Sequence, residues 1–110
     1  MNKKNSKIEE ALYARQVSIC KAFANPIRLR ILDLVSQHVQ PACALQKELA
    51  ISKANLSQHL AVLKGAGIVS TRRNGKSVDC ELALPEVKQA CALIRDVLRA
   101  QIRNGRNLGF

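Results

Sequence analysis

Aromatic side chains are scarce in this chain of 110 residues, which contains two Phe, one Tyr and no Trp. Modules that read RNA or single-stranded DNA stack bases on aromatic side chains, so the composition argues against that class. The core must instead be built from Leu, Ile, Val and Ala. A chain of this length is expected to form one domain, and a domain so small gains stability from pairing with a second copy.

Long apolar runs are also absent. No stretch approaches the roughly 18 consecutive apolar residues of a membrane-spanning helix, and the first seven residues are too polar for a signal peptide. We therefore expect a cytoplasmic protein with no membrane partner. The four cysteines form no C-x-x-C or C-x-C pair, so a disulfide framework is not expected in a reducing compartment.

Motifs of catalysis are missing as well. The chain has no Gly-rich phosphate loop, no paired acids in an apolar setting and no convincing Ser, His and Asp arrangement. A thiol enzyme working through Cys43 would need a nearby base, and only His38 is close in sequence. We therefore expect no enzymatic activity.

Acidic residues are outnumbered, since 18 Lys and Arg face 8 Asp and Glu and give a formal net charge of +10. Such a charge favours a polyanionic partner, either nucleic acid or an acidic membrane surface. Residues 52–76 contain five basic residues and no Asp or Glu. A helix face that is merely solvated usually carries both signs, so this segment favours a nucleic-acid surface.

Hydrophobic spacing and turn residues predict five helices and one β-hairpin. Ser6 is the expected N-cap of the first helix, with Glu9 completing a capping box. Asn25 and Pro26 end that helix and begin the second, and Ser52 caps the fourth. The expected ranges are 6–24, 26–37, 42–50 and 53–65 for the first four helices, 68–84 for the hairpin and 86–103 for the last helix.

Two short helices joined by a tight turn, over 42–65, are typical of a helix-turn-helix. Leu56, Leu60 and Leu63 give the second of these helices a buried stripe, which leaves its polar face free for the major groove. The basic hairpin with the turn signal Asn74-Gly75 is a wing that can contact phosphates or the minor groove. The expected fold is therefore mainly α with a small hairpin, a winged helix-turn-helix of order α-α-α-α-β-β-α.

The last helix repeats apolar residues at spacings of four and three, a seam that favours a partner helix. This seam consists of Val87, Cys91, Ile94, Leu98 and Ile102.

With these elements in order, the chain resembles the ArsR-type winged-helix repressors of bacteria and archaea. The stretches that carry the resemblance are 24–32 (ANPIRLRIL), 48–50 (ELA), 56–64 (LSQHLAVLK), 67–69 (GIV) and 73–76 (RNGK). The resemblance implies a homodimer built on the first and last helices, repression at a palindromic operator, and an inducer that lowers operator affinity. Dimer symmetry places the half-sites about one helical turn apart.

The expected DNA contacts lie on the fourth helix and the wing, and the partner is double-stranded DNA. Gln and Asn side chains can pair with adenine, while Ser, His and basic residues can reach base edges or phosphates. The expected contacts are Lys53, Asn55, Ser57, Gln58 and His59 on the helix and Arg72, Arg73 and Lys76 on the wing.

The usual metal sites of the family are not matched. Many members bind soft metals through Cys-x-Cys in the third helix, where this chain has Leu45, Gln46 and Lys47. Other members use Asp, His and Glu on the last helix, but residues 86–103 contain no His. No metal ligands are therefore assigned, and the thiols remain as the candidate groups on which the inducer acts.

Among the thiols, Cys43 is the preferred sensor because the N-terminus of a short helix favours the thiolate form. Cys20 and Cys91 lie on apolar faces of the first and last helices, where they are either sensors or small buried hydrophobes, and Cys80 is expected to serve strand packing. Thiol oxidation, reactive sulfur, or a soft metal or metalloid such as trivalent arsenic could each act here. The alternative to a specific repressor is a basic architectural protein that binds any duplex.

Overall fold

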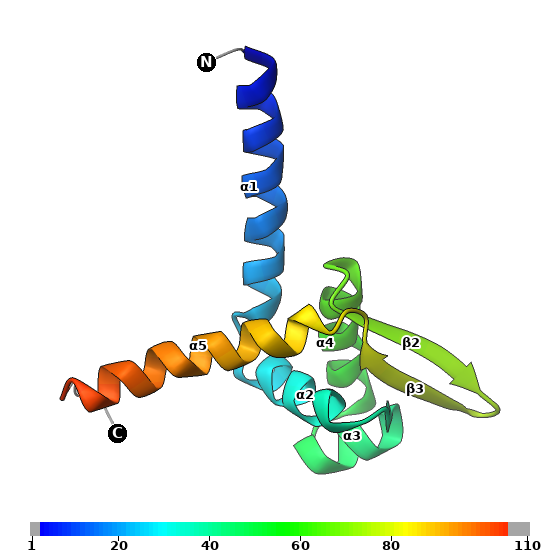
Figure 1. Cartoon of the computed structure of the whole chain (residues 1–110). Coiled ribbons are helices and arrows are strands. Elements are labelled where there is room, and N and C mark those ends of the chain that lie inside the picture. The colour runs from blue at the N-terminus through cyan, green and yellow to red at the C-terminus, as the bar shows by residue number, and fades with distance from the viewer. Residues whose placement is uncertain (1–2, 106–110) are drawn as a thin grey trace.

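Five helices and a three-stranded sheet make up the part of the chain that the computed structural model describes, residues 3–105 (Figure 1). The winged helix-turn-helix expected from the sequence is confirmed. The elements are α1 (Lys3–Phe23), α2 (Pro26–Gln37), β1 (Gln40–Pro41), α3 (Ala42–Leu49), α4 (Lys53–Gly65), β2 (Val69–Asn74), β3 (Ser77–Leu82) and α5 (Glu86–Arg103).

Two of the expected helix caps are present. The Asn25 side chain accepts hydrogen bonds from the backbone N–H groups of Ile27 and Arg28, at 2.9 and 3.1 Å. The Ser52 hydroxyl accepts one from the N–H of Asn55 at 3.1 Å. These caps fix the starts of α2 and α4, since each satisfies N–H groups that have no partner within the helix.

The expected start of the first helix is wrong. Helix α1 begins at Lys3, so Ser6 lies inside the helix instead of capping it, and the helix ends at Phe23. A capping residue is worth only about 1 kcal/mol. Lys3, Lys4 and Asn5 can therefore extend the helix, since lysine is a good helix former.

The turn of the helix-turn-helix begins one residue earlier than expected. Helix α3 ends at Leu49 because Ala50 adopts the left-handed conformation, with φ 53° and ψ 45°. In that conformation the Ala50 N–H donates to the Lys47 carbonyl at 3.3 Å, and the Ile51 N–H donates to the Gln46 carbonyl at 3.3 Å. The turn thus provides hydrogen-bond donors for two carbonyl groups in the last turn of α3. It does so by placing an alanine in the left-handed conformation, which favours glycine.

Replacing Ala50 with glycine should therefore stabilise the protein. We expect Ala50→Gly to raise the free energy of unfolding by about 0.5–1 kcal/mol, since glycine removes the Cβ strain at positive φ. The matched control is Ala54→Gly, an exposed position inside α4, where glycine should cost about 1 kcal/mol. Thermal and urea unfolding measure both, and equal destabilisation by the two substitutions would contradict the assignment of strain to Ala50.

A third strand extends the hairpin into a sheet of order β1-β3-β2, with both pairings antiparallel. Residues 38–41 lie between the second and third helices expected from the sequence, and no strand is expected there, yet Gln40 pairs with Cys80 and Pro41 with Asp79. Two residues are too few to show a strand-like alternation, so this strand becomes visible only through its partner. Cys80 lies on the central strand and is completely buried, as expected for a packing role.

The wing turn is shifted by one residue from the expected Asn74-Gly75. Asn74 pairs with Ser77, so the two-residue loop consists of Gly75 and Lys76. Gly75 has φ +63°, and a two-residue hairpin turn of type II′ places glycine at its first position. The shift puts the Lys76 side chain, which is exposed, at the tip of the wing.

The core lies where α2, α3 and α4 pack against one another and against the sheet. Its fully covered members include Ile31, Leu45, Leu63 and Cys80. Outside it, α1 and α5 extend away from the body as two arms (Figure 1). The radius of gyration is 16.7 Å, against about 13 Å for a compact chain of this length.

Candidate nucleic-acid interface

Helix α4 has one side in the core and the other in solvent. Leu56, Leu60 and Leu63 are buried. Four of the residues on this helix that the sequence assigned to DNA contact are exposed, namely Lys53, Asn55, Ser57 and Gln58. Because the apolar stripe fixes the rotation of the helix, these four side chains are available to an external partner without unfolding.

The wing places further basic side chains in solvent. Arg72, Arg73 and Lys76 are all exposed at or near the β2–β3 turn. The base of the wing is less basic than its tip, because Asp79 faces Arg72 across the two strands and accepts a hydrogen bond from the Asn74 amide at 3.2 Å. The positive charge of the wing is thus concentrated toward the turn.

A groove separates helix α4 from the wing. It has a volume of about 540 Å³ and an apolar floor that includes Leu56, Leu60 and Val78. Lys53, Ser57 and Lys76 line its edges, so residues expected to bind DNA from two elements meet here. Cys43, at the start of α3, lines the same groove.

His59 differs from the other expected contacts because it is only partly exposed. Its Nδ1 lies 3.3 Å from the guanidinium of Arg28 on α2. Burial and the charge of Arg28 lower the pKa of His59 below its ordinary value of 6.5, so the ring is neutral at pH 7. The two residues are 31 positions apart, so no local pattern in the sequence indicates this pair.

The four thiols differ in exposure. Cys43 and Cys20 are exposed, Cys91 is partly buried and Cys80 is fully buried. The sequence left two interpretations for Cys20, a sensor or a small buried hydrophobe. In the isolated chain Cys20 is exposed, so the buried interpretation does not hold there. Burial, and then the Asp79 carboxylate, raise the pKa of Cys80, against a smaller opposite effect of Lys64.

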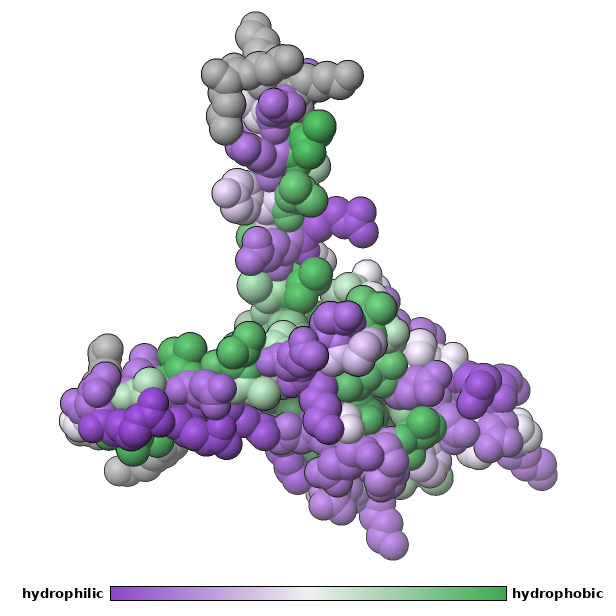
Figure 2. Space-filling view, viewed as in Figure 1, coloured by the Kyte–Doolittle hydropathy of each residue, from purple (hydrophilic) through white to green (hydrophobic). Residues whose placement is uncertain are grey.

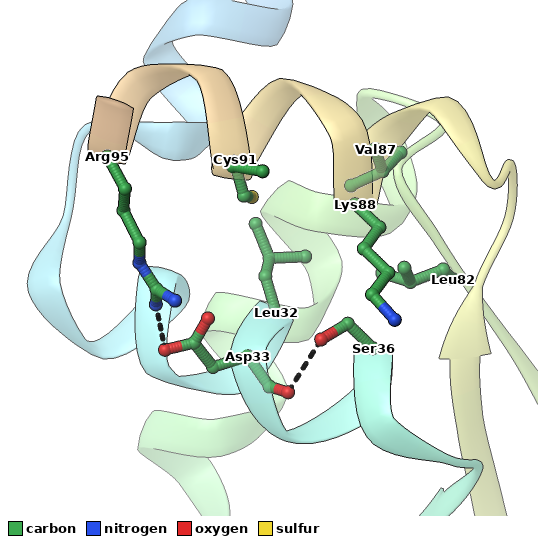
Figure 3. A pocket seen from close by; sticks show the side chains of 9 residues that line it. Leu32, Asp33, Ser36, Leu82, Val87, Lys88, Cys91 and Arg95 are labelled. Atoms are coloured by element: carbon green, nitrogen blue, oxygen red, sulfur yellow. Dashed lines mark hydrogen bonds and ion pairs between the residues drawn. The ribbon is translucent and has the colours of Figure 1, made fainter. Parts of the chain in front are cut away.

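Cys91 faces a cleft of about 120 Å³ between α2 and α5 (Figure 3). Val87 and Leu32 close its apolar side, and an ion pair between Arg95 and Asp33 lies at its other end. Burial raises the pKa of the Cys91 thiol, with a further increase from Asp33 that Arg95 opposes. Cys91 is therefore a protonated thiol at neutral pH and a poorer nucleophile than an exposed cysteine.

Large apolar side chains remain in solvent on both arms, and Figure 2 shows them as green patches along α1 and α5. Leu12 on α1 is 62% exposed and Leu98 on α5 is 43% exposed. Other members of these patches are Ile8, Tyr13, Val17, Leu93, Ile94, Val97 and Ile102. Contiguous apolar surface of this kind marks an interaction site in a soluble domain.

Within residues 3–105, no three His, Cys, Asp or Glu side chains come together in a way that could hold a metal ion. None of the helices described there has the length and apolarity needed to cross a membrane.

Comparison with known proteins gives a consistent result. A family model described as bacterial regulatory protein, arsR family, matches residues 25–71, from the cap of α2 into β2. Rv0081 of Mycobacterium tuberculosis, an HTH-type transcriptional regulator, is 34% identical over 90 residues, which are 81% of this chain and 79% of that protein. Its crystal structure has a TM-score of 0.79 at 32% identity and covers 84% of this chain and 94% of its own.

Two further relatives bear on assembly and on the direction of regulation. The solution structure of the homodimeric winged helix-turn-helix DNA-binding domain of Mb0332 from Mycobacterium bovis has a TM-score of 0.78 at 27% identity, covering 93% of this chain and 94% of that one. The transcriptional activator HlyU of Vibrio cholerae is 37% identical over 81 residues, 74% of this chain and 75% of HlyU.

Proposed function

Because this chain belongs to the arsR family of bacterial regulatory proteins, whose members are winged helix-turn-helix transcriptional regulators and not enzymes, we propose that it is a repressor that binds a palindromic operator as a homodimer. The proposal rests on the exposed side of α4 together with the wing, which we call the reading surface. Helix α4 exposes Asn55, Ser57 and Gln58 beside a basic wing tip, and no acidic residue lies between Ser52 and Lys76.

The homodimer is supported by the two arms. Each arm exposes an apolar stripe that has no packing partner among residues 3–105. The hydrophobic effect favours burying these stripes between two copies of the chain. A twofold axis then displays two copies of α4, and these match successive major grooves on one side of the duplex.

Repression is the direction that the resemblance to ArsR-type repressors implies. In that mode the dimer acts by occupying its operator. The relative HlyU is named an activator, and transcription in vitro from a promoter carrying the selected site distinguishes the two directions. Fewer transcripts with added protein support repression, and more transcripts overturn it.

The experiment that tests specific binding is selection from a random duplex pool by the full-length protein. We expect an inverted repeat with half-sites about one helical turn apart. Binding to that site should survive competitor DNA at salt concentrations that remove non-specific binding. Equal affinity for the selected site and for unrelated duplex would instead support a basic architectural protein.

The inducer is proposed to act through cysteine, with Cys43 as the first candidate. Its thiol is exposed and lines the groove whose edges include Lys53 and Lys76, so a group attached there occupies space that DNA needs. Cys20 on α1 is the second candidate because it is also exposed, and Cys91 comes last because it is partly buried. An oxidant, sulfane sulfur and arsenite are the agents to compare.

Alkylation of Cys43 should therefore abolish most operator binding. With N-ethylmaleimide, the sulfur forms a bond to one ring carbon and the adjacent carbon takes the thiol proton. We expect a loss of at least about tenfold in affinity, which corresponds to roughly 1.4 kcal/mol. Cys43→Ser should resist the reagent while Cys20→Ser behaves like the parent protein. If Cys43→Ser loses binding as fully as the parent, the effect lies elsewhere.

A further inference from the structure

The Arg28 side chain holds together three parts of the protein. Its Nε donates to the carbonyl oxygen of Ala22 at 2.7 Å, and its Nη2 donates to the carbonyl oxygen of Lys21 at 3.0 Å. Both carbonyls belong to the last turn of α1. Its Nη1 lies 3.3 Å from the His59 Nδ1 on α4.

These contacts determine the form of the His59 ring. A guanidinium has donors only, so Nδ1 must accept from it and cannot itself carry a proton. The neutral ring therefore bears its hydrogen on Nε2, and protonating Nδ1 would require Arg28 to move away. The lowered pKa of His59 agrees with this arrangement.

We infer that Arg28 is a positioning residue of the reading surface, which presents His59 to DNA as a neutral ring whose Nε2–H is the available donor. This inference rests on the proposed function and adds a chemical specification to it. A neutral donor can bond guanine N7 or O6, thymine O4 or a phosphate oxygen, but it gains nothing from a second positive charge. His59 thus differs from Lys53 and the wing arginines, which act through charge.

The same side chain connects α1 to α4. Its two carbonyl partners are on the arm that carries an apolar stripe, and its third partner is on the reading helix. A displacement of the last turn of α1 relative to α4 must lengthen at least one of these hydrogen bonds. Arg28 therefore provides a hydrogen-bonded route by which a change in the packing of α1 reaches His59.

A double-mutant cycle tests this role in operator binding. We expect Arg28→Met to lower operator affinity about fivefold to tenfold and His59→Ala to do the same, while the double variant loses no more than either single one, because Arg28 acts through His59. Arg30→Met is the matched control, since Arg30 is exposed on the same helix. Losses that multiply in the double variant would overturn the inference.

A measurement without DNA separates this inference from the proposed function. Histidine titration followed by NMR should place the His59 midpoint below 6.5, and Arg28→Met should raise that midpoint, with the only other histidine, His38, as internal reference. Arg28→Lys is a second folded variant, because lysine lacks the fork that serves three acceptors at once. We expect it to weaken binding in the same direction. An unchanged His59 midpoint in Arg28→Met overturns the inference, whereas absent operator selection by the parent protein overturns the proposed function.

Discussion

Leu98→Glu should convert the protein to a monomer and lower operator affinity by at least about 100-fold. The Leu98 side chain is 43% exposed in the single chain, on the seam of α5 that continues from the buried Val87. In the proposed dimer this residue becomes buried. Placing a carboxylate in an apolar interface costs several kcal/mol, and the twofold axis imposes that cost twice.

Sedimentation velocity and operator titration measure the two effects on the same samples. The control is Ala92→Glu, which adds the same charge on the exposed polar side of α5, near Lys88 and Arg95. It should leave both assembly and affinity unchanged. A Leu98→Glu protein that remains dimeric would show that α5 does not form the interface, and equal loss in both variants would point to a general charge effect on DNA binding.

Gln58→Ala should lower affinity for the selected operator by about 10- to 100-fold, because a bidentate contact to a base is worth roughly 1–3 kcal/mol. Gln58 is exposed on α4, between Leu56 and Leu60, which are buried. Removing its amide therefore leaves the fold intact. The loss should be accompanied by weaker discrimination at one base pair of each half-site, while affinity for unrelated duplex changes little.

Single-base substitutions across the operator, titrated with both proteins, measure this directly. Gln89→Ala provides the same chemical change at an exposed position of α5 and should have no effect. An equal loss on specific and unrelated DNA would mean that Gln58 contacts the backbone. No loss on either would exclude Gln58 from the interface.

Local signals in the sequence predicted most of the fold. The side chains of Asn25 and Ser52 cap α2 and α4 as expected, because capping depends on a residue and the three that follow it. The stripe Leu56, Leu60 and Leu63 likewise fixed which side of α4 is exposed. Such features depend on spacing within one element, so one chain is enough to reveal them.

Features that depend on distant residues were not predictable. The strand β1 exists through its pairing with β3, some 40 residues later, and its two residues carry no pattern of their own. The contact between Arg28 and His59 depends on how α2 packs against α4. The shift of the wing turn to Gly75 and Lys76 came from strand register, which the turn dipeptide alone does not determine.

Hydroxyl-radical footprinting of the selected operator tests the central claim most directly, because it reads the geometry of both reading helices at once. We expect two protected patches on the same side of the duplex, related by twofold symmetry and about one helical turn apart, with additional protection where the wings lie. A single asymmetric patch, or uniform weak protection along the whole duplex, would contradict a symmetric pair of α4 helices reading the DNA.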